Sequence, residues 1–333
     1  MSPPHTMRRR KIIFWMVAGI FLVASVFVAF LLSGPAAEPM PEPNGYHDLF
    51  KASQQVITAF NEQSSTPIGL SEYRHFDAAL LRTAVNANAE ALQIARLGLA
   101  KECRIPAEAV EATFLGFNSL VAWRGLGSAF AAEGYLAELE GDFDRAALSY
   151  LDLIHLGHDS FRGGLIMHRL IGQAFESIGL NALAPLADKV DAESASAIVR
   201  RLREFERKRE PAQRTIRFDR HQTWKKEGIR GYVTSVKMTR SLLPWKRFSG
   251  RFRSQFDHLR AKSLEVTIAF AARSFAHEHG APPRNITALV PKYFDDVPRD
   301  PLTGRVVTLT WRAPIYRPRA DAARLPTMPP RLE

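Results

Sequence analysis

Two groups of histidine and acidic residues carry side chains that could bind a metal ion. His277 and His279 flank Glu278 near the end of a predicted helix. Because residues two apart on a helix point in roughly opposite directions, these two imidazoles cannot reach one ion. His155 and His158 are three apart and could share an ion, but two histidines without a third ligand make a weak site. We therefore expect a solvated helix end at the first group, and turn or interface residues at the second.

Three aspartates near the C-terminus are the other candidate ligands. Asp295, Asp296 and Asp300 lie in one predicted loop and carry the hard oxygen atoms that suit Ca²⁺. A calcium ion needs about 6–8 oxygen ligands, which this loop alone does not supply. We interpret Asp300 and the following Pro301 as a turn and the other two aspartates as surface charge. The sequence predicts no metal ion and no cofactor.

The chain lacks the common short motifs of catalytic and phosphate-binding sites. It contains no GxSxG, HExxH, GxxxxGK[ST] or GxGxxG sequence. Its single cysteine, Cys103, lies beside Arg104, but a small, partly buried residue at a helix end is the simpler interpretation. His168 lies among apolar residues and is interpreted as a core histidine. The sequence therefore identifies no catalytic residues and favours a non-enzymatic protein.

The most informative element is an apolar stretch of 21 residues, from 12 to 32, with no charged side chain. As a helix it would span roughly 31 Å, about the thickness of the hydrocarbon core of a bilayer. Positive charge stays on the cytoplasmic side of such helices, so a transmembrane helix with the short N-terminus inside is predicted. The residues predicted to set this topology and to anchor the helix are Arg8, Arg9, Arg10, Lys11 and Trp15.

A cleaved signal peptide is the alternative to this uncleaved anchor. Cleavage would follow Ala36, but Pro35 is unfavourable in such a site and the apolar stretch is long for a signal peptide. We therefore expect a single-pass protein of the cytoplasmic (inner) membrane whose bulk is extracytoplasmic.

The rest of the chain predicts a mainly α-helical protein. Apolar residues make up 46% of the sequence, which is enough for a substantial core. The predicted segments are a cytoplasmic N-terminus (1–11), the transmembrane helix (12–32), a Pro-rich linker (33–43), a helical domain (44–210), a basic helical connector (211–249), a small α+β-like module with a short strand (250–312) and an unstructured tail (313–333).

Within the helical domain, apolar residues recur at three- and four-residue spacing. Glycines near the middle of the third helix indicate close helix packing or a break near Gly125. The predicted helices run from about Asn44 to Asn61, Ser71 to Leu97, Pro106 to Leu139, 143 to 156, 161 to 180 and 191 to 209.

Small and aromatic residues recur in residues 127–158, at Gly134, Gly141, Ala146 and Tyr150. In this pattern the stretch resembles one tetratricopeptide repeat (TPR). The resemblance implies two helices that cross at Gly134, a turn at Gly141, and packing by Ala146 and Tyr150 from the second helix. The family's proline after the second helix is absent here. We expect an irregular stack of such hairpins, with a peptide-binding groove as the alternative.

Charge is distributed unevenly along the chain. Residues 36–199 contain 11 Lys/Arg against 21 Asp/Glu, whereas residues 200–260 contain 19 against 6. The basic segment could pack on the acidic half, contact anionic lipid or an envelope polymer, or bind a partner protein. Its predicted extracytoplasmic position argues against nucleic acid. The candidate anionic contacts are Arg240, Trp245, Lys246, Arg247, Arg251 and Arg253.

The C-terminal module begins with a long predicted helix that stops at Gly280, followed by a short helix capped by Asn285 and a strand at Val306–Trp311. The helix is followed by a pattern of turn and apolar residues: Gly280, Pro283, Leu289, Val297, Pro298, Asp300, Pro301 and Gly304. In this pattern the segment from about 255 to 311 is similar to the helix-to-loop region of type II secretion pseudopilin-like proteins. In a pseudopilin this helix continues from the N-terminal anchor, so pilus assembly is not implied here.

The sequence as a whole favours a membrane-anchored extracytoplasmic scaffold or interaction protein of the bacterial envelope. An accessory component of a type II secretion or pilus-like system is the alternative, and it rests on the C-terminal resemblance. An envelope hydrolase whose site is not recognised is the third interpretation.

Overall fold

The computed structural model describes residues 15–16, 18–23, 25, 39–57, 76–110, 118–159, 162–241, 245–312 and 315–319, with side chains at all of these except 118–121, 229–254 and 310–319. The described part is mainly α-helical, as predicted. Strands occur in it only near the C-terminus.

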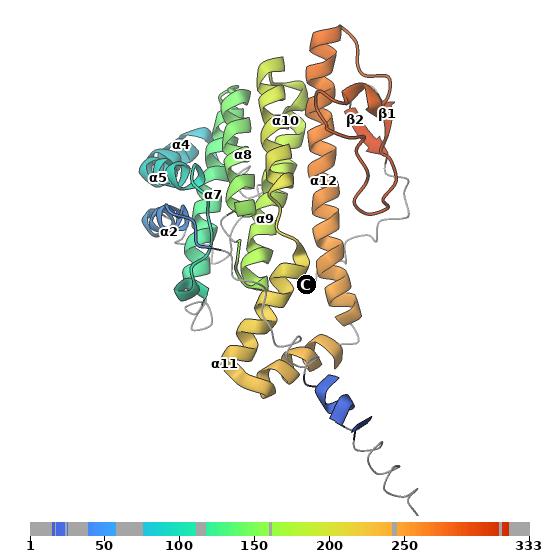
Figure 1. Cartoon of the computed structure of the whole chain (residues 1–333). Helices are drawn as coiled ribbons and strands as arrows, with labels where there is room; N and C mark the ends of the chain where they lie inside the picture. The colour runs from blue at the N-terminus through green and yellow to red at the C-terminus, as the bar shows by residue number, and fades with distance from the viewer. Residues whose placement is uncertain are drawn as a thin grey trace, which may run out of the picture.

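Five long helices stand side by side in the body (Figure 1). In the described part of the chain, α8 packs against both α7 and α9, and α10 packs against α12. The helices are α7 (Asn118–Leu139), α8 (Phe143–Asp159), α9 (Ile166–Leu183), α10 (Ala192–Arg207) and α12 (Trp245–His279), and a 3₁₀-helix η1 (Ala184–Asp188) follows α9.

Three shorter helices, α2 (Tyr46–Gln55), α4 (Ala78–Ala87) and α5 (Ala89–Leu99), cover the α7 side of the body. The prediction of one helix through residues 78–97 is wrong, because the chain breaks at Asn88. The Asn88 side chain donates to the carbonyl oxygen of Ile57 and accepts a hydrogen bond from the Ile57 backbone N–H. Ile57, which lies 31 residues away in the sequence, therefore stabilises the break between α4 and α5. The predicted helix starting at Ser71 lies partly outside the described residues.

α7 runs without a break through Gly125, so its glycines serve close packing. A Cβ atom added at Gly127 would lie 2.6 Å from the Phe175 ring, and one at Gly134 would lie 2.8 Å from carbons of the Tyr150 ring. The first contact joins α7 to α9 and the second joins α7 to α8.

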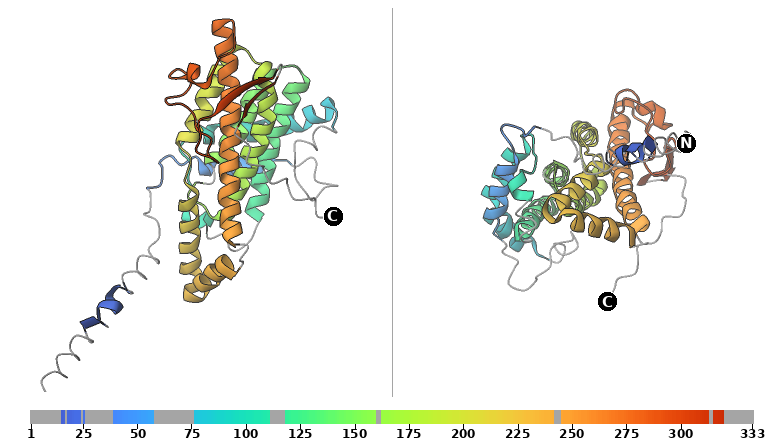
Figure 2. Two further views of the ribbon diagram at one scale, coloured as in Figure 1. Left: turned by 90° about the vertical axis from the view of Figure 1, so that its right-hand side faces the viewer. Right: turned by 60° about the horizontal axis from the view of Figure 1, so that its bottom comes forward.

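α11 (Ala212–Ser241) carries the chain to the end of the body opposite the tip of α12 (Figures 1 and 2). Gly228 has a φ of 62°, which is the left-handed region that glycine adopts readily, and it bends α11 there. The chain then returns along α12.

The C-terminal module contains the predicted long helix, short capped helix and strand, in that order. α12 ends at Gly280, which has a φ of 70°, and Asn285 caps η2 (Ile286–Leu289) by accepting a hydrogen bond from the Ala288 backbone N–H. The predicted strand is β1 (Thr308–Arg312), which pairs with antiparallel β2 (Ile315–Arg319). β2 lies in the segment expected to be an unstructured tail, and this expectation is wrong for residues 315–319. A strand needs a neighbour for its backbone hydrogen bonds, and β2 is that neighbour.

Two large hydrophobic clusters fill the described body. One lies among α2, α4, α5, α7, α8 and the start of α9. The other joins α8, α9, α10 and α12 to the C-terminal module through Ile286, Leu289, Tyr293 and Phe294. The predicted boundary near residue 250 therefore does not separate two cores.

The described N-terminal residues are helical and project away from the body (Figures 1 and 2). Among the described residues, no helix is long and apolar enough to span a membrane. The predicted span 12–32 is described only in part, and the four basic residues before it lie outside the description. Large exposed apolar side chains of this segment are Trp15, Met16, Ile20, Phe21, Leu22 and Val23.

Candidate functional site

The candidate metal ligands of the C-terminal module do not converge. His277 and His279 are exposed at the end of α12. Exposed Asp295 pairs with Arg203, whereas Asp300 is buried and accepts hydrogen bonds from the backbone N–H of Leu302 (2.9 Å) and from a threonine hydroxyl. This is the turn expected at Asp300. Within the described residues, no group of three or more His, Cys, Asp or Glu side chains could hold a metal ion.

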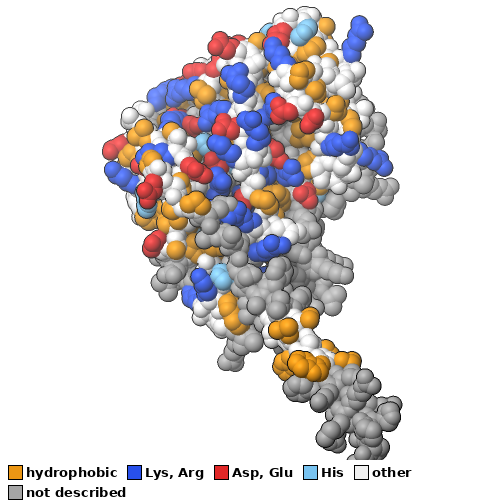
Figure 3. Space-filling view, in the orientation of Figure 1, with side chains coloured by type: hydrophobic (Ala, Val, Ile, Leu, Met, Phe, Trp, Pro, Cys, Tyr) orange, Lys and Arg blue, Asp and Glu red, His pale blue; other side chains and the backbone are white. Residues whose placement is uncertain are grey.

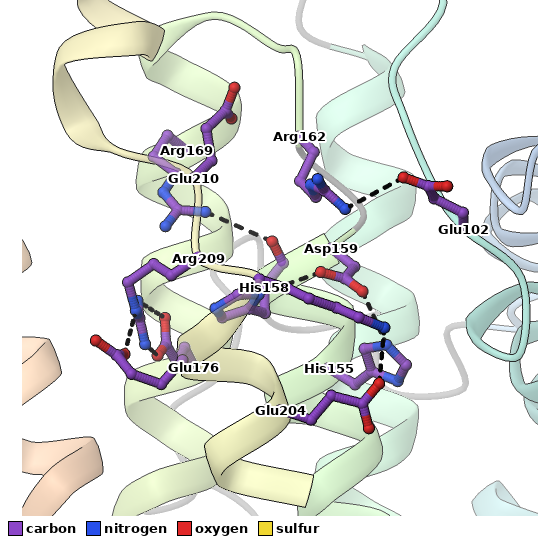
Figure 4. A network of polar contacts seen from close by, with 12 residues as sticks. Glu102, His155, His158, Asp159, Arg162, Arg169, Glu176, Glu204, Arg209 and Glu210 are labelled. Atoms are coloured by element: carbon purple, nitrogen blue, oxygen red, sulfur yellow. Dashed lines mark hydrogen bonds and ion pairs between the residues drawn. The ribbon is translucent and has the colours of Figure 1, made fainter. Parts of the chain in front are cut away.

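His155 and His158 lie instead in a buried polar network between α8, α9 and α10 (Figure 4). The Asp159 carboxylate is 3.1 Å from His155 Nε2 and 3.1 Å from His158 Nδ1. Burial raises the pKa of Asp159, but hydrogen bonds from both histidines outweigh it and hold that pKa well below its ordinary value. Burial lowers the pKa of His158 below its ordinary value, although the hydrogen bond to Asp159 opposes this shift. The three residues therefore form one histidine–carboxylate cluster.

The most deeply buried ion pair of the network joins α9 to Arg209, two residues after the end of α10. The Arg209 guanidinium donates two hydrogen bonds to the Glu176 carboxylate, one of them 3.0 Å long. The two side chains are only 4% and 1% exposed. Arg209 Nε also donates to Glu206 (2.6 Å), which accepts a further bond from Arg260 of α12 (2.6 Å). The chain of ion pairs therefore ties three helices together.

Arg169 of α9 is the second fully buried arginine. Its guanidinium carbon lies 5.1 Å from the centre of the Phe256 ring of α12, and the Arg209 guanidinium lies 5.5 Å from the same ring. Its Nη1 atom is 3.5 Å from the carbonyl oxygen of His158, while Nε and Nη2 have no hydrogen-bond partner among the described protein groups. Arg169 and Arg209 thus lie near the buried carboxylates Asp159, Glu176 and Glu210.

This arrangement joins packed helices through ion pairs between groups of opposite charge. Cys103 is also buried, and burial raises the pKa of its thiol, so it is an unreactive core residue.

His168 is a buried histidine at the start of α9, as expected for a core histidine. Its Nδ1 atom accepts a hydrogen bond from the Leu165 backbone N–H (3.0 Å), and burial lowers its pKa from 6.5 to about 4. The folded protein therefore binds a proton at His168 less readily than the unfolded chain does. The stability that follows is present above pH 6.5 and is lost as pH falls through about 4.

Between pH 7 and pH 4, we expect the free energy of unfolding of His168→Gln to fall by about 2–3 kcal/mol less than that of the wild type. Glutamine keeps an acceptor for the Leu165 N–H but does not titrate. Urea unfolding of both proteins across this range measures the difference. His279→Gln, at an exposed position, is the matched control for replacing a histidine by glutamine. An equal slope in wild type and His168→Gln would show that His168 does not carry this effect.

The predicted hairpin residues are brought together at the α7–α8 crossing. Tyr150 and Ala146 are fully buried, and the Tyr150 ring packs on Gly134. Gly141 forms the turn between the two helices with a φ of 78°. The Tyr150 hydroxyl donates to Glu138 (2.6 Å).

The basic segment, residues 200–260, is considered in two parts: a first part, residues 200–228, and the stretch from residue 229 onward. In its first part, arginines pair with carboxylates of the same chain: Arg201 with Asp152 (3.3 Å), and Arg203 with Asp295. The later candidate contacts lie on the helical backbones of α11 and α12, and their side chains lie outside the description. These residues are Arg240, Trp245, Lys246, Arg247, Arg251 and Arg253.

Sequence reasoning missed the central residues of the network, Arg169, Glu176 and Arg209. A signal was present, because Arg169 and Glu176 lie seven apart and are the Arg and Glu residues of a mainly apolar helix. That spacing places them on one helix face, where they can be buried only with partners of opposite charge.

Comparison with known proteins gives no relative for this chain. No protein-family model matches it, and no curated protein or solved structure matches it either. The TPR-like and pseudopilin-like resemblances therefore stay predictions from the sequence.

Proposed function

We propose that this chain is a membrane-anchored scaffold or interaction protein of the bacterial envelope. The observation that carries the proposal is the N-terminal helical segment, which projects from the body with its large apolar side chains exposed. On the face in Figure 3, Lys and Arg are interspersed with Asp and Glu over the body, while apolar side chains gather on this segment. A bilayer would cover that apolar surface.

The internal polar network supports a structural rather than a catalytic role. Its ion pairs join α9, α10 and α12, and the Arg209–Glu176 pair at its centre is buried between packed helices. A body fixed in this way is suited to hold a constant surface for other proteins.

An accessory role in a type II secretion or pilus-like system is the second candidate. It is supported by the order of elements in the C-terminal module: a long helix, a turn at Gly280, a short capped helix, a turn at Asp300 and a strand pair. Crosslinking in cells followed by co-purification separates the two candidates, because secretion proteins among the partners would favour the second.

Membrane extraction tests the anchor. We expect the full chain to stay with membranes after alkaline carbonate washing, and Ile20→Arg/Val23→Arg to be released, because a charge near the centre of a span costs about 2.5–3.5 kcal/mol. Ile57→Arg/Leu97→Arg adds the same charges at two exposed apolar positions of the body and should stay bound.

Release of the wild-type protein by carbonate would contradict the anchor. A mature form lacking residues 1–36 would instead show a cleaved signal peptide.

A further inference from the structure

The two parts of the basic segment differ in their internal partners. Arg201 and Arg209, in the first part, donate to Asp152 and Glu176 of the same chain. Asp152 also accepts from Arg96 of α5 (2.8 Å). These two arginines of the first part are therefore paired within the body.

Residues 229–254 have no acidic residue with which to repeat this arrangement. The stretch contains seven Lys or Arg residues and no Asp or Glu. Aromatic and aliphatic residues are interleaved with these bases, a composition typical of helices that lie at an anionic membrane surface. The basic residues are Arg230, Lys237, Arg240, Lys246, Arg247, Arg251 and Arg253, and the aromatic ones are Tyr232, Trp245, Phe248 and Phe252.

The fold places this stretch at one end of the molecule. α11 bends at Gly228, close to exposed Lys225 and Lys226, and ends at Ser241, while α12 begins at Trp245. In Figure 1 and the left view of Figure 2, the N-terminal helical segment extends from the body beyond this same end. The C-terminal end of α12, at His279, lies at the opposite end of the body.

We propose that the helical segments 229–241 and 245–254 contact the anionic lipid headgroups of the bilayer that holds the N-terminal segment. The inference rests on the proposed membrane anchor. Charge complementarity and proximity to the anchor favour lipid, because the bases would lie within a Debye length of the headgroups. In the acidic half of the chain, Asp152 and Glu176 already pair with arginines.

Site-specific fluorescence on the full chain in lipid nanodiscs tests the contact. A polarity-sensitive dye is attached to Thr239→Cys or Ser249→Cys, and Ala281→Cys, at an exposed position beyond the tip of α12, is the matched control. Buried Cys103 should not react. We expect a blue shift, and quenching by a lipid-headgroup quencher, at the first two positions when phosphatidylglycerol is added to phosphatidylcholine. Both effects should weaken between about 0.1 and about 0.5 M NaCl, as the Debye length shortens.

A charge variant provides the matched comparison. Arg240→Gln/Lys246→Gln/Arg247→Gln should lose the lipid-dependent signal, whereas Lys51→Gln/Arg200→Gln/Arg284→Gln removes the same charge at exposed positions elsewhere and should keep it. Equal signals in neutral and anionic nanodiscs, or none in either, would overturn the proposal while carbonate extraction reports on the anchor separately. A signal that appears only with an added acidic protein would also overturn it, in favour of a protein partner.

Discussion

Glu176→Gln is expected to lower the free energy of unfolding by about 3–5 kcal/mol, the cost of breaking a buried ion pair by removing one partner. Glu176 is 1% exposed and accepts two hydrogen bonds from Arg209, which is itself 4% exposed. The neutral amide would leave the Arg209 guanidinium buried with only Glu206 to compensate its charge. Urea unfolding of the full chain in mild detergent measures the loss.

Two control substitutions separate this effect from charge removal in general. Glu204→Gln breaks the Glu204–Lys208 pair on the surface of α10 and should cost at most about 1 kcal/mol. Arg169→Met removes a buried charge whose Nε and Nη2 lack partners, and it should cost far less than Glu176→Gln. If Glu176→Gln matched Glu204→Gln in stability, the network would not be holding the helices together.

The Glu176–Arg209 pair also has a defined dependence on pH. Burial raises the pKa of Glu176, but the nearby Arg209 charge and its hydrogen bonds outweigh burial and lower that pKa below its ordinary value of 4.5. Its contribution to stability is therefore present above pH 4.5 and is lost as pH falls through the folded-state pKa. The Glu176→Gln variant should lose less stability than wild type in this acidic range.

Features that depend on neighbouring residues could be predicted from the sequence. The stop of α12 at Gly280, the cap of η2 by Asn285 and the turn at Asp300 follow from residues within one or two turns of each other. Asp191 likewise caps α10 by accepting from the Ser194 backbone N–H (2.7 Å). Each signal is a local preference of the backbone for a glycine or a short polar side chain.

Features that depend on distant partners could not be predicted. The break at Asn88 is held by Ile57, which lies 31 residues away. The buried ion pair joins Glu176 to Arg209, which are 33 residues apart. The spacing of apolar residues does not indicate which arginine pairs with which carboxylate. The hydrophobic pattern fixes which helix face is buried, while the pairing of charges on that face is set by the tertiary packing.

Gly157→Val is expected to destabilise the protein by about 4 kcal/mol, at the upper end of overpacking effects. A Cβ atom at Gly157 of α8 would lie 2.8 Å from the backbone nitrogen of Glu176 in α9, and still closer to the carbonyl oxygen of Gly172. The obstacles are backbone atoms, so α8 and α9 would have to move apart. That movement would also disturb His158, the next residue on α8, and the position of Glu176. Urea unfolding measures the loss.

Gly134 provides the contrast that tests this argument. Its obstacle is the Tyr150 ring, and a side chain can be shortened. Gly134→Ala should therefore be partly rescued by Tyr150→Leu, giving a favourable coupling energy in a double-mutant cycle. For Gly157→Val no truncation can remove the obstacle, so a Gly157→Val/Phe175→Leu double variant, which shortens a neighbouring α9 side chain, should show no rescue. Rescue at Gly157 would mean that the side chains of α9, rather than its backbone, set how closely α8 and α9 approach.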